Sequence, residues 1–314
     1  MGRPVNRSDG MKAIEVRGLR KSYGDLQAVR GISFDVEEGS FFAFLGPNGA
    51  GKSTTISMLC SLLAPDSGEI HIFGKEPDEA RADLGIVFQD NMLDKWLTVR
   101  ENVSLRGGMY GYGKEELAAR THAALERAGC TEFADRRYSD LSGGQRRRAD
   151  IARALVHGPR ILMLDEPTAG LDPQTRKLIW SSIRSLQAEG MTVFLTTHYM
   201  EEAADADDVV VIDAGEISAH GTPAVLREEY SSDYLDILSR DMAAAESYLK
   251  AEGIAYEVRV DVLRIPLEKT VLALPILKAL EENIESFEVR SGTMDDAFIS
   301  ITGGIGERTR CYSS

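Results

Sequence analysis

The fold is decided by residues 41–54, which read Phe41-Phe42-Ala43-Phe44-Leu45-Gly46-Pro47-Asn48-Gly49-Ala50-Gly51-Lys52-Ser53-Thr54. The first five residues predict a buried strand, and apolar residues then recur at helical spacing from Ile56 to Leu63. Between them, Gly46 to Ser53 match the phosphate-loop pattern G-x-x-x-x-G-K-[ST] in its strand-to-helix context. A glycine-rich turn alone would not explain why Lys52 and Ser53 follow the last glycine.

The residue types of this loop suit the phosphates of a nucleotide. Glycines let successive backbone N–H groups converge on a phosphate without obstruction by Cβ atoms. The helix that starts near Lys52 adds its positive N-terminal end. We expect Lys52 to reach the β and γ phosphates and the Ser53 hydroxyl to ligate Mg²⁺.

Polar side chains end three further predicted strands. Asp165 and Glu166 follow the apolar run 161–164, so Asp165 can hold Mg²⁺ through its water shell and Glu166 can orient the attacking water. His198 ends the run 192–197 and is expected to contact the γ-phosphate. Gln89 follows the run 85–88 and can touch Mg²⁺ or water as a neutral ligand.

A second phosphate-binding device is predicted at Leu141-Ser142-Gly143-Gly144-Gln145. Its small residues would again expose backbone N–H groups at the start of a helix. A single nucleotide does not obviously need both devices from one subunit.

The pattern of apolar runs predicts an α/β core over residues 11–220, with a mostly helical insert at about 97–155. Residues 1–10 are polar and are expected to form a leader ahead of the folded part. After Gly221 the order of elements becomes β-α-β-β-α-β, with single helices predicted over 241–251 and 268–282. This order predicts a small ferredoxin-like α+β domain over residues 221–314.

The composition narrows the classes of function. The chain has 314 residues and a formal net charge of −14, which makes it a poor candidate for binding nucleic acid. No apolar stretch approaches the ~18 residues that a membrane-spanning helix needs. We therefore expect a cytoplasmic protein whose membrane role, if any, comes through a partner. Cys60, Cys130 and Cys311 lack metal or redox spacing and are interpreted as inert thiols.

Together, these motifs resemble the ATP-binding subunits of ABC transporters over about residues 12–223. The resemblance implies a P-loop NTPase core that binds and hydrolyses ATP with Mg²⁺, and two copies that sandwich two ATP molecules head to tail.

The resemblance also assigns roles to individual residues. Tyr23 matches the aromatic residue that stacks on adenine, and Gly46 to Thr54 match the Walker A loop. Gln89 matches the glutamine that links the site to the membrane subunit. The signature that acts across the dimer is matched by Ser142, Gly143, Gly144 and Gln145. Asp165 and Glu166 match the Mg²⁺-linked carboxylate and the catalytic base, Asp172 lies in the loop that connects the two sites, and His198 matches the switch histidine.

Three longer runs are similar to the daunorubicin-resistance type of exporter ATPase: 88–94, 145–150 and 294–303. This similarity implies export of a drug, lipid or polysaccharide-like substrate through a separate membrane permease. The chain would then lie at the cytoplasmic face of the cell membrane.

Three alternatives stay open at the level of sequence. The chain could be a soluble ABC ATPase that acts on ribosomes or DNA. Residues 221–314 could sense a ligand or gate the dimer, or they could be a passive dimerisation or stabilising module. The arginines of Gln145-Arg146-Arg147-Arg148 could form a plain solvated helix start or have a special role.

Overall fold

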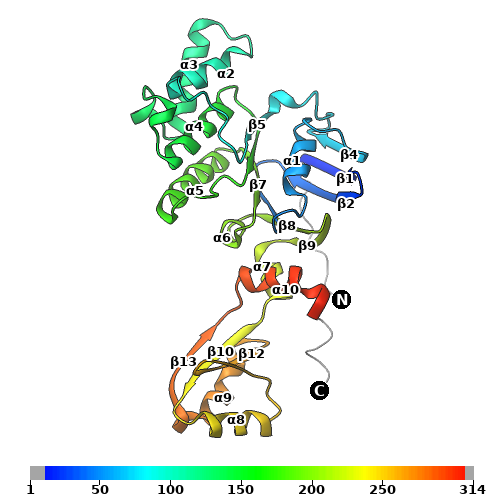
Figure 1. The fold of residues 1–314 in the computed structure, drawn as a ribbon, viewed down its shortest axis with the longest axis vertical. Helices are drawn as coiled ribbons and strands as arrows, with labels where there is room; N and C mark the ends of the chain where they lie inside the picture. Colours follow the sequence, from blue (N-terminus) through cyan, green and yellow to red (C-terminus); the bar gives the residue numbers. More distant parts are fainter. Residues whose placement is uncertain (1–10, 308–314) are drawn as a thin grey trace. The chain divides into compact units, whose positions relative to one another are not determined.

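Strand β3 (Phe41–Leu45), whose residues are all buried, lies inside a six-stranded sheet of order β5-β6-β7-β3-β8-β9 (Figure 1). The computed structural model describes residues 11–307 of the chain. The strands from β5 to β8 pair in parallel, which confirms the predicted α/β core. The other strands of this sheet are β5 (Leu84–Val87), β6 (Ile161–Asp165), β7 (Thr192–Thr197), β8 (Asp208–Asp213) and β9 (Glu216–Gly221).

A second, antiparallel sheet of order β2-β1-β4 packs against the first. The contact between the sheets is aromatic, since the Phe34 ring lies 5.5 Å from that of Phe42 and 6.1 Å from that of Phe194. Each ring buried in this way stabilises the core by roughly 1.5–3 kcal/mol. The strands of the second sheet are β1 (Lys12–Tyr23), β2 (Leu26–Glu37) and β4 (Ser67–Ile72).

Strand β4 begins with a distorted pair at Ser67. Ser67 already pairs with Arg20 of β1, across an irregular register. Gly68 has φ +97°, and a Cβ there would lie 2.6 Å from the carbonyl oxygen of Gly18. The glycine therefore marks a distorted first pair of the strand rather than a connection outside it.

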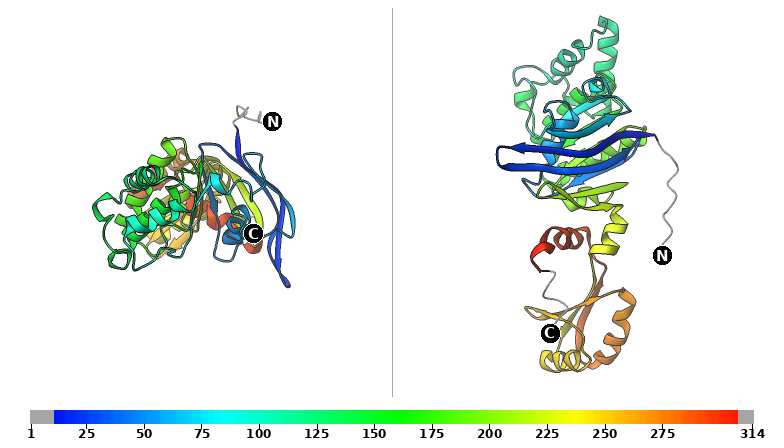
Figure 2. Two further views of the ribbon diagram at one scale, coloured as in Figure 1. Left: turned by 90° about the horizontal axis from the view of Figure 1, so that it is seen from above. Right: turned by 90° about the vertical axis from the view of Figure 1, so that its right-hand side faces the viewer.

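Helices flank the parallel sheet. The predicted helical insert is confirmed, and Figures 1 and 2 show α2–α4 on one side of that sheet and the β1–β2–β4 sheet on the other. The helices of this part are α1 (Lys52–Leu59), α2 (Val99–Gly108), α3 (Lys114–Arg127), α4 (Gly143–Leu155), α5 (Pro173–Ala188) and α6 (Met200–Ala203).

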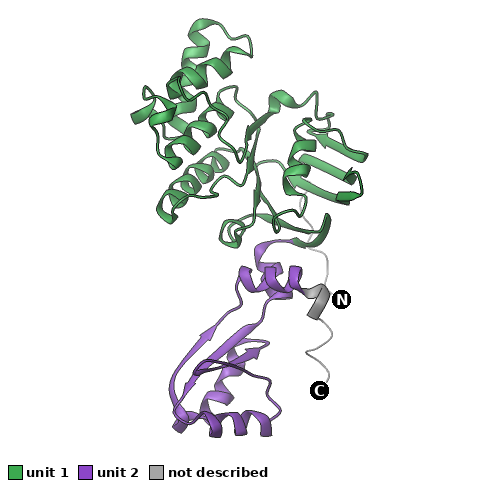
Figure 3. Ribbon diagram, viewed as in Figure 1, with its two compact units in different colours: residues 1–220 green, residues 221–314 purple. Residues whose placement is uncertain are grey.

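The chain divides into two compact units, Met1–His220 and Gly221–Ser314 (Figure 3). The second unit has an antiparallel sheet of order β11-β12-β10-β13, covered on one face by α8 and α9. This topology confirms the ferredoxin-like β-α-β-β-α-β order. Its elements are α7 (Pro223–Tyr230), β10 (Asp233–Ser239), α8 (Met242–Ala251), β11 (Glu257–Arg259), β12 (Val262–Leu267), α9 (Ala273–Ala279), β13 (Ile284–Arg290) and α10 (Met294–Glu307).

The helix predicted over residues 268–282 is shorter in the structure. A 3-10 turn at Thr270–Leu272 precedes α9, and another at Glu281–Asn283 follows it. Pro275 explains the late start, because proline lacks an N–H group and is tolerated only in the first turn of a helix.

Among residues 11–307, no helix is both long and apolar enough to cross a membrane. The predicted leader, residues 1–10, and Cys311 lie outside the described residues.

Candidate functional site

The phosphate loop connects β3 to α1 and lies directly beside the neighbouring strands. The Gly46 N–H donates to the carbonyl oxygen of Thr197 at 3.2 Å, and a Cβ at Gly46 would lie 2.3 Å from the carbonyl oxygen of Ile212. Only glycine fits this approach. Lys52, 5% exposed, donates from Nζ to the carbonyl oxygens of Gly46 and Pro47 at 2.8 and 3.1 Å. The Lys52 side chain thus folds back over the loop and binds its backbone.

Two carboxylates at the end of β6 face this lysine. Asp165 accepts hydrogen bonds from the Ser53 hydroxyl, with Oγ 3.4 Å from Oδ1, and from the Thr196 hydroxyl. One oxygen of Glu166 lies 3.2 Å from Lys52 Nζ, and the other lies 3.2 Å from Nδ1 of His198. The structure therefore brings a lysine, a glutamate and a histidine from three separate motifs into direct contact.

The backbone of Glu166 accounts for this placement. Its φ is +44°, a left-handed conformation that disfavours a non-glycine residue by roughly 1–2 kcal/mol. The Glu166 N–H donates to the carbonyl oxygen of Thr196 at 3.1 Å, which holds the chain in that conformation. Strain of this kind persists where surrounding contacts enforce it. Here it turns the carboxylate between Lys52 and His198.

A cleft of about 420 Å³ opens in front of these groups. Tyr23 and Leu26, at the ends of β1 and β2, line it together with Gln89, which follows β5. The Tyr23 ring is 51% exposed, so it is free to stack on a flat ligand. Of the predicted nucleotide-binding residues, Gly46, Pro47 and Ala50 shape the loop without lining the cleft. The others that line it are Asn48, Gly49, Gly51, Lys52, Ser53 and Thr54.

The oxygen atoms in and beside this cleft suit Mg²⁺: Ser53 and Gln89 line the cleft, and Asp165 contacts Ser53. Ser53, Asp165 and Gln89 offer hydroxyl, carboxylate and amide oxygens, which are the hard ligands that Mg²⁺ prefers. The described residues contain no group of three or more His, Cys, Asp or Glu side chains that could hold a metal by themselves. Mg²⁺ characteristically takes its remaining ligands from water and phosphate. The residues fit a Mg²⁺ ion that arrives with a nucleotide.

The second predicted device, at the start of α4, does not line this cleft. Ser142 caps the helix by accepting from the Gln145 N–H at 3.3 Å, while Gln145 Oε1 accepts from the Ser142 N–H at 3.0 Å. A Cβ at Gly144 would lie 2.1 Å from Cγ2 of Thr175 in α5. Ser142 and Gly143 are exposed, so their surface is available to another molecule.

Asp172 caps the neighbouring helix α5. Its Oδ1 accepts from the Thr175 N–H at 3.0 Å, and these contacts with Thr175 hold the pKa of the carboxyl below its usual range. The same Thr175 packs against Gly144. The predicted signature and the predicted connecting loop are therefore neighbours in one subunit, although neither belongs to its own nucleotide cleft.

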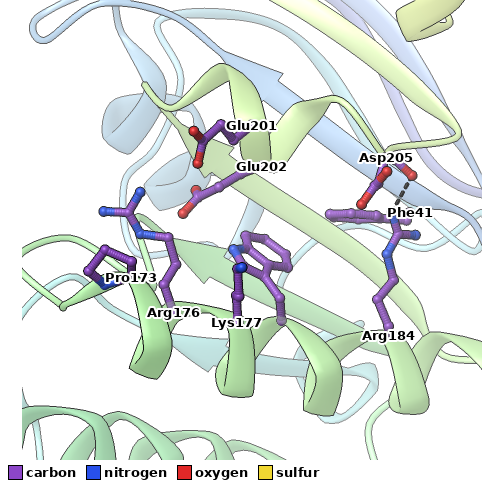
Figure 4. A pocket seen from close by; sticks show the side chains of 9 residues that line it. Phe41, Pro173, Arg176, Lys177, Arg184, Glu201, Glu202 and Asp205 are labelled. Atoms are coloured by element: carbon purple, nitrogen blue, oxygen red, sulfur yellow. Dashed lines mark hydrogen bonds between the residues drawn. The ribbon is translucent and has the colours of Figure 1, made fainter.

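A hollow of about 480 Å³ lies between α5 and α6 (Figure 4). Two of its polar side chains bind the surrounding loops. Glu202, drawn in the centre of the figure, accepts hydrogen bonds from the hydroxyls of Thr168 and Thr197, and burial raises its pKa. The guanidinium of Arg184 donates to the carbonyl of Asp205 (dashed line). Thr168 follows Glu166 by two residues and Thr197 precedes His198, so Glu202 links the loops that carry these two side chains.

Sequence reasoning missed two residues that support the site, Thr196 and Glu202, and left the role of a third, Arg147, open. Thr196 binds both Asp165 and the backbone of Glu166, Glu202 joins the two loops, and Arg147 binds the backbone at Gln89. Thr196 and Glu202 each lie within four residues of His198, which is the only signal that could have marked them. Cys60 and Cys130 are buried, which raises the pKa of each thiol to about 12 and makes both unreactive.

Comparisons with known proteins give a consistent result. The family model described as "ABC transporter" matches residues 29–169. The daunorubicin resistance ATP-binding protein DrrA3 of Streptomyces coeruleorubidus is 38% identical, over 93% of this chain and 96% of that protein. The Nod factor export ATP-binding protein I of Paraburkholderia xenovorans is 40% identical, over 93% and 97%. The linearmycin resistance ATP-binding protein LnrL of Bacillus subtilis is 37% identical, over 92% and 98%.

Solved structures resemble the chain over a shorter part. The structure of cbiO1 from Clostridium perfringens, part of the ABC transporter complex cbiONQ, has a TM-score of 0.64 at 33% identity and covers 68% of this chain and 90% of that one. A dimeric post-hydrolysis structure of the ATP-binding cassette MJ0796, bound to ADP and Pi, has a TM-score of 0.61 at 31% identity and covers 67% and 98%.

Proposed function

Because the chain belongs to the ATP-binding subunits of ABC transporters, we propose that it hydrolyses ATP to power export through a separate membrane subunit. The observation that carries the proposal is the contact of Glu166 with both Lys52 and His198. Lys52 and Glu166 line the cleft of the phosphate loop, so a base and a cation would face the terminal phosphate, with the histidine on the other side of the base.

The proposed roles follow from the geometry. Lys52 leaves the loop carbonyls and binds the β and γ phosphates, as a buried ammonium with few other partners would. Glu166 accepts a hydrogen bond from the attacking water and orients it. His198 contacts the γ-phosphate from the other side of Glu166. Tyr23 stacks on the adenine at the rim of the cleft.

Ser53, Asp165 and Gln89 would hold Mg²⁺, which supplies charge neutralisation at the β and γ phosphates. Asp165 would hold the ion through its water shell, and the Thr196 hydroxyl orients the carboxylate. Ser53 lines the cleft from α1, and Gln89 lines it from the segment that follows β5.

The site is complete only when two copies of the chain meet. Ser142, Gly143, Gly144 and Gln145 would act on the ATP of a second subunit, because they do not line the cleft of their own. The exposed start of α4 offers backbone N–H groups and a positive helix end to that nucleotide. Asp172, at the start of the adjacent α5, would connect the two sites of the homodimer.

The membrane subunit would dock beside Gln89 and the helical insert. Large apolar side chains are exposed there: Trp96 is 67% exposed, Met92 56% and Met109 72%. Exposed apolar side chains of this size are typical of protein–protein contacts. Docking at this surface would place the chain at the cytoplasmic face of the cell membrane.

The relatives named above favour export of a drug, lipid or polysaccharide-like molecule, because daunorubicin resistance, linearmycin resistance and Nod factor export stand in their names. They match nearly the whole chain, which favours transport over the alternative of a ribosome- or DNA-associated ATPase. The second unit would be a passive dimerisation or stabilising module, with ligand sensing or gating of the dimer as its alternative role.

Capture of the tagged chain from detergent-solubilised membranes tests this proposal. We expect a polytopic membrane protein to accompany the chain, and we expect the Trp96→Ala variant to lose it. The Val225→Ala variant, changed at a 41% exposed apolar residue of the second unit, serves as the matched control. Co-purification of ribosomal proteins in place of a membrane protein would contradict the proposal.

A further inference from the structure

The three consecutive arginines after the signature reach three different places. Arg146 donates to the carbonyl oxygen of Ser139 at 2.9 Å, and Arg148 donates to that of Gly129 at 2.9 Å. Both of these carbonyls belong to the helical insert. Arg147 instead turns toward the parallel sheet and is only 6% exposed. The run is therefore not a uniform solvated helix start.

Arg147 binds the chain at Gln89. Its Nη1 donates to the carbonyl oxygen of Phe88 at 2.5 Å, and its Nη2 donates to the carbonyl oxygen of Gln89 at 2.8 Å. One planar guanidinium thus spans two consecutive peptide units, a geometry that lysine cannot reproduce. This contact fixes the backbone from which the Gln89 side chain enters the nucleotide cleft.

A second arginine of α4 contacts β5 itself. Arg153 lies six residues after Arg147, and its Nη2 donates to the carbonyl oxygen of Ile86 at 2.7 Å. β5 is an edge strand of its sheet, so one row of its backbone groups lacks a strand partner. Arg153 binds a carbonyl of this strand, and Arg147 binds the two carbonyls that follow it.

Asp150 lies between the two arginines and makes their burial tolerable. It is 2% exposed, and it accepts a hydrogen bond from the Tyr138 hydroxyl at 3.2 Å. Burial raises its pKa to about 6, while Arg147, Arg153, Tyr138 and the backbone N–H of Met92 favour its charged form. A buried charge is less costly when opposite charges and hydrogen bonds surround it, and the carboxylate of Asp150 and the two guanidinium groups favour each other's charged forms in this way.

We propose that Arg147 is a positioning residue for Gln89, and that α4 thereby ties the glutamine of one ATP site to the signature that serves the other. This inference rests on the role proposed above for Gln89. Because α4 is one continuous helix with Ser142 at its cap, movement of the signature on ATP also moves Arg147. The two carbonyl contacts then carry the chain at Gln89 with the helix.

A set of variants tests the inference through steady-state ATP hydrolysis. We expect Arg147→Met to lower kcat about ten- to hundredfold with little change in KM, because a misplaced group slows the reaction more than it weakens binding. Arg147→Lys, which keeps the charge but not the two-pronged geometry, should fall between wild type and Arg147→Met. Arg148→Met removes an equivalent arginine–carbonyl contact elsewhere and should keep the wild-type kcat and a similar Tm.

A double variant with Gln89→Ala distinguishes a positioning role of Arg147 from a purely structural one. If Arg147 acts through Gln89, the double variant Arg147→Met/Gln89→Ala is no slower than Gln89→Ala alone. Multiplied losses in the double variant, or a wild-type kcat in Arg147→Lys, would overturn the inference and leave the proposed function standing. A wild-type kcat in Gln89→Ala would instead refute the proposed role of Gln89, and the inference with it.

Discussion

Replacement of Glu166 by glutamine tests the assignment of the catalytic base. The amide has the shape of the carboxylate, and Glu166 is only 8% exposed, so the backbone contacts that hold residue 166 should survive. The change removes the group that accepts a proton from the attacking water. Loss of a positioned general base slows a reaction by about 10²–10⁴-fold, or roughly 3–5 kcal/mol in the activation free energy.

Binding of ATP should not weaken in the same variant. Glu166 lies 3.2 Å from Lys52 Nζ, so its negative charge competes with the phosphates for that ammonium. Neutralising it leaves Lys52 free for the nucleotide, and we expect an ATP affinity equal to or above that of wild type. A lower rate of hydrolysis with unchanged or tighter ATP binding would show that Glu166 acts in the chemical step and not in binding.

Phosphate release at saturating Mg²⁺-ATP measures the first effect, and titration with a fluorescent ATP analogue measures the second. Glu201→Gln is the matched control, because Glu201 is an exposed carboxylate on α6 that touches none of the catalytic side chains described. Hydrolysis by Glu166→Gln at the wild-type rate would show that another group acts as the base.

Three further predictions concern binding and stability. Tyr23→Ala should weaken ATP binding by roughly 1–3 kcal/mol through loss of stacking, whereas Tyr23→Phe should retain it, as measured by nucleotide titration. Gly46→Ala should lower the free energy of unfolding by about 1–3 kcal/mol or more in urea titrations, because its Cβ would lie 2.3 Å from the carbonyl oxygen of Ile212. His157 is buried with Nε2 3.0 Å from the carbonyl oxygen of Leu84, and burial lowers its pKa from 6.5 to about 4. The unfolded chain therefore binds the proton first, and this residue should remove roughly 2 kcal/mol of stability between pH 7 and pH 5, a loss that is absent in His157→Gln. An equal pH dependence in both proteins would show that His157 is not the source.

The parts of the fold that local pattern controls were predictable from the sequence. The run Phe41–Leu45 followed by the phosphate loop predicts a buried strand and a helix, and parallel strands align their carboxyl ends at one edge. That rule alone brings Asp165, His198 and Gln89 toward the loop. The late start of α9 was also predictable, because Pro275 is tolerated only in the first turn of a helix. The apolar pattern of residues 268–282 nevertheless favoured a longer helix.

Other features depend on contacts between distant segments. The left-handed conformation of Glu166 results from Thr196, which is 30 residues away in the sequence. Arg147 has two arginine neighbours of the same chemistry, and only the helix register relative to β5 selects it for burial. Packing between distant segments determines both features, and the periodicity of apolar residues in the sequence does not predict it.

If a second copy of the chain completes each ATP site, the Glu166→Gln protein should dimerise when it binds ATP, and its mass in solution measures this. Light scattering should give the 34.4 kDa of one chain without nucleotide and twice that mass with ATP. Ser142→Arg in the same background should still bind ATP but remain a monomer, because its bulk blocks the exposed signature. A Glu166→Gln chain that stays monomeric with bound ATP, or a Ser142→Arg chain that dimerises equally well, would contradict the account.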